Sequence, residues 1–161
     1  MAKAGYSVVT GGAVALTGGT AKTVLGVKSH ANFGLDLLRV WWGFVDTVAT
    51  EAPVTCELCY CTWVTNSPGT ASTTLSAPAI TQVYGRTITP GFTAAKNWTT
   101  EPTVLTPITE VPLTPNGGLV LHDGSLGMTP DCDLAHGFAL RFTAASGADT
   151  SVRATMWVER C

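Results

Sequence analysis

Residues 54–65 read VTCELCYCTWVT, and this stretch decides the fold class. It is rich in β-branched, aromatic and cysteine residues, and a period of two residues divides its side chains between two faces. One face takes Val54, Cys56, Leu58, Tyr60, Thr62 and Val64, and the other takes Thr55, Glu57, Cys59, Cys61, Trp63 and Thr65. Successive side chains of a β-strand point to opposite faces of a sheet. The stretch is therefore predicted to be a strand.

The same period appears at residues 35–48, 138–143 and 151–159. The first of these segments is expected to place Leu38, Val40, Trp42 and Phe44 on one face and Arg39, Trp41, Gly43 and Thr47 on the other. The last is expected to bury Val152, Ala154, Met156 and Val158 and to expose Arg153, Thr155 and Trp157. Residues 104–113 also alternate, and their prolines indicate an edge strand, because proline donates no ladder hydrogen bond.

Turn signals separate these segments, since the chain holds 17 glycines and 9 prolines. The pattern predicts about eight strands and no helix, which is typical of an all-β, antiparallel β-sandwich with a jelly-roll-like arrangement. Long loops expected at residues 66–80 and 90–103 fit Greek-key crossings. Residues 1–23, rich in Gly, Thr and Ala, are predicted to form an extended N-terminal arm with room for a short strand at residues 6–10, and residues 24–161 a single sandwich domain.

The composition narrows the classes of function. Charged residues make up 12% of the chain, about half of the usual share of roughly 25%. A surface so poor in charge is often partly covered by other subunits, although a neutral surface facing water is the alternative. The formal net charge is −2 and no run of Lys or Arg occurs, so neither nucleic-acid binding nor a membrane partner is predicted. No apolar run reaches the roughly 20 residues of a spanning helix.

The cysteines favour a protein made in the cytoplasm with reduced thiols. Their number, five, is odd, whereas a secreted disulfide framework usually has an even number. Three of them form Cys56-x-x-Cys59-x-Cys61, which looks like half of a zinc knuckle. On a strand Cys56 faces away from Cys59 and Cys61, so the three thiols cannot converge on one metal. Small buried thiols are the expected outcome.

A second metal candidate lies further along the chain. The residues in question are His122, Asp131, Asp133 and His136, whose imidazoles and carboxylates suit Zn²⁺ or Ca²⁺. Their spacing matches no named metal loop, and aspartates in loops commonly bond to the backbone instead. They remain weak candidates, and no metal or cofactor is predicted.

No catalytic arrangement stands out in the sequence. The GxSxG motif of serine hydrolases is absent, and the three histidines, His30, His122 and His136, lie on separate segments. Most acidic residues stand singly at turns, which does not favour paired catalytic carboxylates. We therefore expect no enzymatic activity.

Four tryptophans are candidates for an interaction surface. Trp41, Trp63 and Trp157 fall on the less apolar faces of their predicted strands, and Trp98 falls in a predicted loop. Tryptophan is enriched at protein interfaces and in sugar platforms. The alternative is that a second sheet covers these faces and makes both sides of the strands core.

Three segments of the C-terminal half carry a resemblance to a known family. They are NGGLVL at residues 116–121, GFALRFTA at 137–144 and VRATMWVER at 152–160. This half of the chain resembles the head decoration or minor capsid proteins of tailed bacteriophages. The resemblance implies a β-sandwich or jelly-roll body, often trimeric, on the outside of an assembled icosahedral shell, with no catalytic residues.

Together these observations predict a structural virion protein that binds the major capsid protein on the outer surface of the phage head and stabilises the shell. It would be made in the host cytoplasm and form a homotrimer. The alternative is a carbohydrate- or receptor-binding β-sandwich module that uses Trp63 or Trp98 and loop carboxylates. A cupin-like enzyme would need two or three histidines and a glutamate around a metal, and the histidines here are dispersed.

Overall fold

A computed structural model describes residues 3–45, 52–69, 79–116, 120–123 and 129–161, with side chains for all of these except 79 and 120–123. None of the described residues forms a helix long and apolar enough to cross a membrane. The regular elements in these ranges are twelve strands: β1 (Gly5–Val9), β2 (Val14–Leu16), β3 (Ala21–Lys28), β4 (Leu35–Phe44), β5 (Val54–Cys61), β6 (Ala79–Tyr84), β7 (Thr93–Lys96), β8 (Leu105–Leu113), β9 (Val120–Asp123), β10 (Asp131–Cys132), β11 (Gly137–Thr143) and β12 (Thr150–Arg160).

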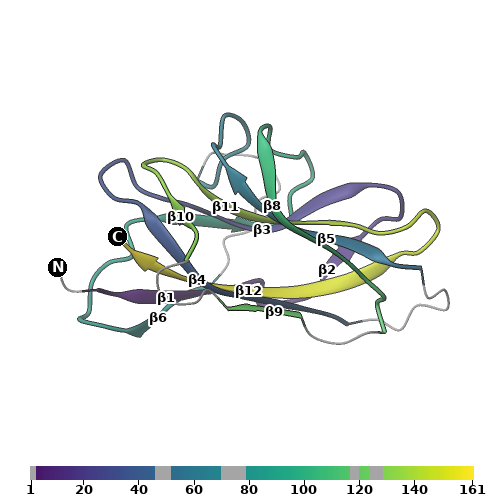
Figure 1. The fold of residues 1–161 in the computed structure, drawn as a ribbon, viewed down its shortest axis with the longest axis horizontal. Helices are drawn as coiled ribbons and strands as arrows, with labels where there is room; N and C mark the ends of the chain where they lie inside the picture. Colours follow the sequence, from purple (N-terminus) through teal and green to yellow (C-terminus); the bar gives the residue numbers. More distant parts are fainter. Residues whose placement is uncertain (1–2, 46–51, 70–78, 117–119, 124–128) are drawn as a thin grey trace.

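The strands form two antiparallel sheets that pack face to face (Figure 1). Sheet A has seven strands: its main order is β10-β4-β12-β1-β6, while β2 also pairs with β12 and β9 with β4. Sheet B has five strands in the order β7-β3-β11-β5-β8. The predicted all-β sandwich is confirmed. The predicted number of strands is too low, because β2, β7 and β10 have only three, four and two residues and are too short to show a period.

Strand pairing follows a nested order along the chain. β1 pairs with β12, β3 with β11, β4 with β9 and β10, and β5 with β8. Successive pairs lie in opposite sheets. Between β5 and β8 in the sequence, β6 and β7 extend the two sheets beside β1 and β3. Strands from the two ends of the chain, β1 and β12, therefore lie side by side inside sheet A.

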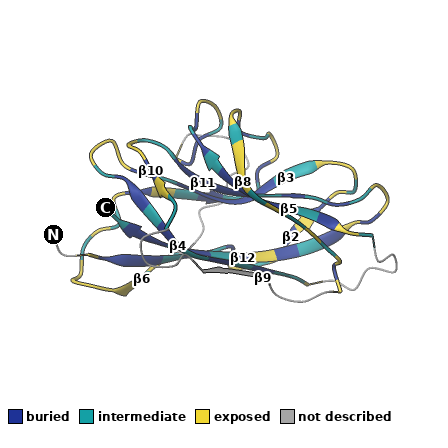
Figure 2. Cartoon of the chain, viewed as in Figure 1, coloured by how far each residue is buried: buried dark blue, intermediate teal, exposed yellow. Residues whose placement is uncertain are grey.

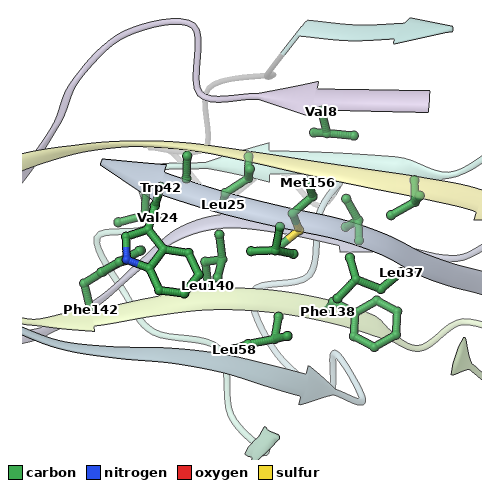
Figure 3. Close-up of a cluster of buried hydrophobic side chains, with 14 of the residues drawn as sticks. Val8, Val24, Leu25, Leu37, Trp42, Leu58, Phe138, Leu140, Phe142 and Met156 are labelled. Atoms are coloured by element: carbon green, nitrogen blue, oxygen red, sulfur yellow. The ribbon is translucent and has the colours of Figure 1, made fainter. Parts of the chain in front are cut away.

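The hydrophobic core lies between the two sheets (Figure 3). Sheet B contributes Phe138, Leu140 and Phe142, and sheet A contributes Trp42 and Met156, all of them buried. Trp42 meets Phe142 edge to face, with ring centroids 5.8 Å apart. Each large apolar side chain buried in this way contributes about 1.5–3 kcal/mol. Figure 2 shows the buried residues gathered between the layers and exposed residues in the outer loops.

The alternation predicted for β12 is confirmed, and that for β4 is only partly right. β12 buries Val152, Ala154, Met156 and Val158. In β4, Arg39 pairs with Trp157 but Leu37 pairs with Val158, so Leu38 is an extra residue in a β-bulge. Leu37 is therefore buried in the core while Leu38, expected there, is half-buried. A bulge reverses the alternation, which a strict period of two does not reveal. Thr47 lies outside the described residues.

The extended arm predicted over residues 1–23 is not confirmed. β1 lies in the interior of sheet A between β12 and β6, and β2 pairs with β12. Tyr6 and Val8 point into the core, and the Tyr6 hydroxyl donates a 2.9 Å hydrogen bond to the carbonyl of Ile88. Two apolar side chains spaced by two residues build a strand here, although the surrounding glycines suggest an arm.

Two other segments differ from the sequence expectation. β7 lies within the predicted loop 90–103 and pairs with β3. β6 begins at Ala79, inside the predicted loop 66–80, because it aligns with β1 from Ala79 to Tyr84. Within the predicted loop 66–80, residues 70–78 lie outside the described residues.

Candidate interaction surface

Neighbouring strands of sheet A carry an aromatic patch on the outer face of the sandwich. The register of β4 and β12 places Arg39 opposite Trp157 and Trp41 opposite Thr155. The rings of Trp41 and Trp157 meet edge to face, with centroids 5.4 Å apart and an interplanar angle of 70°. The guanidinium carbon of Arg39 lies 5.4 Å from the centroid of the Trp157 ring, within the range of a cation–π interaction. We call Arg39, Trp41 and Trp157 the aromatic patch.

Small, uncharged residues flank the aromatic patch on the side of β1 and along β4. On the side of β1, Ser7 pairs with Trp157. Along β4, Gly43 has open space around it, with no atom within 4 Å of the position that a Cβ would take. Trp41 and Trp157 are half-buried, and within the described residues their ring contacts are with each other and with Arg39. On its other side the patch borders β9, where Leu121 pairs with Trp41 and Asp123 pairs with Arg39.

Opposite charges mark the two ends of this outer face. At one end the register aligns Asp131 of β10, Asp36 of β4 and Glu159 of β12. At the other end Arg153 of β12 is exposed and pairs with Gly43. The aromatic patch lies between these ends. We call them the acidic end and the arginine end.

The acidic end keeps a net negative charge. Glu159 is balanced by Lys3, whose Nζ lies 2.8 Å from Oε1, and it accepts a 2.6 Å hydrogen bond from the Tyr84 hydroxyl. Burial opposes ionisation of Glu159, but the hydrogen bonds from Lys3 and Tyr84 hold its pKa below its usual value. Burial and, to a smaller degree, the carboxylates of Glu159 and Asp131 raise the pKa of Asp36. Lys3 also acts on Asp36 and partly opposes this rise, but neither Asp36 nor Asp131 forms a salt bridge among the side chains that the structure describes.

A second tryptophan pair lies on the outer face of sheet B, and this pair is covered. Trp63 and Trp98 stack with centroids 5.7 Å apart and are only 4% and 1% exposed. A Cβ on Gly26 beneath them would lie 2.7 Å from Trp63 and 2.9 Å from Trp98, so only glycine lets the rings sit this close to the sheet. Gly26 belongs to a row of small residues in register across four strands: Cys59, Ala139, Gly26 and Ala95.

Hydrogen bonds hold this layer, which we call the sheet B cap and which comprises residues 62–67 and 97–104. Trp63 Nε1 donates to a backbone carbonyl of β3 at 3.1 Å, and Trp98 Nε1 donates to the carbonyl of Asn66 at 2.8 Å. The carboxylate of Glu101 accepts from the backbone N of Thr23 at 2.6 Å and from its hydroxyl at 2.5 Å. Burial raises the pKa of Glu101, while the hydrogen bonds from Thr23 lower it in part.

The four candidate tryptophans therefore divide by sheet. Trp63 and Trp98 belong to the buried cap, where neither ring is open to a sugar or to a partner. Trp41 and Trp157 stay half-buried on sheet A. The outer face of sheet B is covered as the alternative expects, but the cover is the loops of the cap and not a second sheet. Arg39 was not among the sequence candidates, although its position two residues before Trp41 on the same face was a usable signal.

The cysteines of the CxxCxC pattern lie on both sides of sheet B, as the alternation predicts. Cys56 is in the core between the sheets, whereas Cys59 and Cys61 lie beneath the cap. Burial raises the pKa of Cys56 and Cys59 to about 12 and that of Cys61 to about 11. All three are therefore neutral thiols at physiological pH and poor nucleophiles.

The weak metal candidates do not assemble into a site among the described residues, where no group of three or more His, Cys, Asp or Glu side chains is placed to hold a metal. Asp131 is exposed on β10, and Asp133 accepts a 2.7 Å hydrogen bond from the next backbone N–H, which is turn chemistry. The Nδ1 atom of His136 bonds to the hydroxyl of Tyr60. The side chain of His122 lies outside the described residues.

Comparison with known proteins identifies no relative. No protein-family model matches the chain, and neither the curated proteins nor the solved structures give a significant match. The geometry of the two outer faces is therefore the basis for assigning a function.

Proposed function

We propose that this chain is a structural virion protein, a decoration or minor capsid protein that binds the outside of an icosahedral phage head and stabilises it. The observation that carries the proposal is the aromatic patch, because tryptophan and arginine are enriched at the energetic centres of protein interfaces. The patch lies on the outer face of a sheet, which suits a protein surface better than a small-molecule cleft. The resemblance of the C-terminal half supplies the phage head as the setting.

The proposed architecture is a jelly roll, a double-sheet fold common in viral capsid domains. Such a fold is a long antiparallel hairpin rolled up, so that the first strand pairs with the last and pairing proceeds inward. The nested pairs β1–β12, β3–β11, β4–β9 or β10 and β5–β8 support this assignment. In it β6 and β7 are additions that lengthen the two sheets.

The proposed partners are the major capsid protein and sister copies in a closed homo-oligomer, with a trimer expected. A net charge of −2 supports a position on the outer surface, because contact with a packaged genome calls for clustered positive charge. The edge strand β8 carries Pro107 and Pro112, which supports assembly through faces, because proline interrupts pairing along an edge. The proposal assigns no catalytic activity.

Co-expression with the major capsid protein encoded in the same genome tests the proposal. We expect the chain to co-sediment with assembled shells in a fixed ratio to capsid protein, and not with unassembled capsid protein. Shells that carry the chain should also withstand higher temperatures, since a protein that binds only the assembled state stabilises it by mass action.

Two results would overturn the proposal. One is a chain that leaves assembled shells bare at saturating concentration. The other is a chain that ignores shells but gives a specific signal on a glycan array, which would put the carbohydrate-binding alternative in its place. Shells assembled without the chain, heated in parallel, are the control for the stabilisation measurement.

A further inference from the structure

We propose that the outer face of sheet A is the contact between copies of this chain, with the acidic end of one copy against the arginine end of another. The inference rests on the closed homo-oligomer proposed above and names the surface that builds it. Three features of this face support it: the incomplete burial of its tryptophans, the opposite charges at its two ends, and the absence of a comparable open surface on sheet B.

The tryptophan pair on sheet B shows how far a covered pair is buried in this protein, and the pair on sheet A can be compared with it. On sheet B the cap reduces the exposure of Trp63 and Trp98 to 4% and 1%. On sheet A the pair Trp41 and Trp157 stays half-buried, with Arg39 against the ring of Trp157. A second copy seated on this face would complete the burial, and tryptophans in fully desolvated pockets are what dominate interface energies.

The charges on the face select an orientation for that second copy. From Asp36 to Gly43, β4 covers about 23 Å at about 3.3 Å per residue, and Arg153 lies beside the far end. The aromatic patch lies near the middle of this distance. A copy turned end for end therefore sets tryptophans against tryptophans and its arginine end against Asp36 and Asp131. The parallel orientation would bring like charges together, which is unfavourable.

This pairing closes as a two-fold dimer. The strands of the two faces run in opposite directions, and each copy contributes the same surface. A ring of three is built from heterologous contacts and cannot use this end-for-end pairing. The sheet A contact therefore favours a dimer over the trimer that the resemblance implies, and the mass of the particle in solution distinguishes the two.

The surfaces of sheet B offer less to a second copy. Its outer face is occupied by the cap, whose tryptophans already fill the row of small residues beneath them. Its edge strand β8 is largely exposed, but Pro107 and Pro112 interrupt the N–H groups that a further strand would need. Sheet A therefore presents the better docking face.

The role of the aromatic patch in the contact can be tested by measuring the molar mass of the protein in solution by light scattering over a dilution series. We expect the native chain to be oligomeric and Trp157→Ala to weaken association by roughly tenfold or more, as for a central interface residue. Ile108→Ala is the matched control, because Ile108 is 44% exposed on β8, away from the face. Far-ultraviolet circular dichroism and thermal melting verify folding, and Trp157→Phe serves if the alanine variant does not fold.

Charge reversal tests the orientation. Arg153→Glu and Asp36→Arg are each expected to weaken association by roughly tenfold, because each sets like charges together. The double variant restores the pairing with its signs exchanged, so association should recover. Lys28→Glu is the control for Arg153→Glu, since it also reverses one positive charge but lies on β3 of sheet B.

The outcomes separate this inference from the proposed function. Association unchanged in the Trp157 and Arg153 variants would overturn the sheet A contact while leaving shell binding to stand. A double variant that stays dissociated would overturn the end-to-end orientation. A native chain that is monomeric at every concentration would overturn the closed homo-oligomer and this contact together, and co-sedimentation with shells would then decide the rest of the function.

Discussion

The two outer faces of the sandwich use the same residue type in opposite ways. Each carries a pair of tryptophans, yet the pair on sheet B is stacked and buried, whereas the pair on sheet A meets edge to face and stays half-buried. The strands themselves do not explain the difference, because both pairs lie on antiparallel sheets. It arises from what lies below and above the rings.

Below the rings, sheet B provides a seat that sheet A lacks. The row through Gly26 consists of small residues, so two indoles lie flat on the backbone. In sheet A the residues flanking Trp157 are Ser7 and Arg39, and the guanidinium covers one part of the ring. Above the rings, the chain supplies its own cap on sheet B. The comparison teaches that a tryptophan on an outer face belongs to the core when other parts of the chain cover its ring. When they do not, the ring is available to form an interface with another molecule.

The strongest way to break this comparison is to truncate one tryptophan on each face. Trp63→Ala should lower the free energy of unfolding by about 3–5 kcal/mol, because it leaves a cavity in a packed layer. Trp157→Ala should cost less than about 1.5 kcal/mol in the dissociated chain, since its ring is only partly buried and its loss leaves no enclosed cavity. Urea unfolding followed by circular dichroism, at one low protein concentration for all variants, measures both.

Equal losses in the two variants would contradict the distinction between core and interface. The low concentration matters, because association would otherwise add to the apparent stability of the native chain and of the Trp63 variant. Trp98→Ala should behave like Trp63→Ala, since the two rings stack and are both buried.

Replacing one glycine on each face by alanine should give the next largest difference in stability between the two faces. Gly26→Ala should destabilise by about 1–3 kcal/mol, because the new Cβ would lie under 3 Å from both cap tryptophans. Gly43→Ala should be neutral or stabilising by up to about 1 kcal/mol, because its Cβ meets open space and alanine has fewer unfolded conformations to lose. Thermal melting of both variants beside the native chain measures the contrast. A tolerated Gly26→Ala would mean that the rings do not rest on the sheet.

Long strands made most of the fold predictable. β5, β11 and β12 show a period of two over seven residues or more, and their faces follow from it. The bulge at Leu38 and the short strands β2, β7 and β10 are set by pairing with distant segments and leave no period in their own sequence. The same holds for β1, where Tyr6 and Val8 acquire a face only through neighbours from both sides.

Half of the candidate site was predictable, for a similar reason. The period of two placed Trp41 and Trp157 on outward faces, and the structure agrees. It also placed Trp63 on an outward face, but the burial of that ring depends on a row of small residues from four strands. Register brings Cys59 and Ala139 together although 80 positions separate them in the chain. No local window of sequence contains that row.

The partly buried carboxyl group of Glu101 gives a smaller test of how the cap covers sheet B, through the dependence of stability on pH. Burial raises the folded pKa of Glu101 above its ordinary value of 4.5, although Thr23 opposes the rise. The stability linked to its protonated form is thus fully present below about pH 4.5 and is lost as the pH rises through the folded pKa. Glu101→Gln keeps an acceptor for Thr23 without a charge. It should remove this decline, a change of no more than about 1.5 kcal/mol.

Unfolding free energies measured from pH 4 to pH 8 test this expectation. The difference between Glu101→Gln and the native chain should move in favour of glutamine as the pH rises. Glu110→Gln is the control for loss of one carboxylate, because Glu110 is exposed on β8. A difference that is constant with pH, or that moves in favour of glutamate, would contradict burial as the dominant influence on Glu101.

Thiol labelling gives the smallest effect on stability and the most local view of the cap. Cys161 is exposed, whereas Cys59 and Cys61 are buried beneath the cap with pKa values raised to about 12 and about 11. Reaction requires both access and thiolate, so timed alkylation followed by mass spectrometry should modify Cys161 first in the native chain. Trp63→Ala should bring Cys59 and Cys61 into reaction, and Trp157→Ala should not. If both variants labelled these thiols alike, the cap would not be what protects them, and the contrast between the two faces would fail.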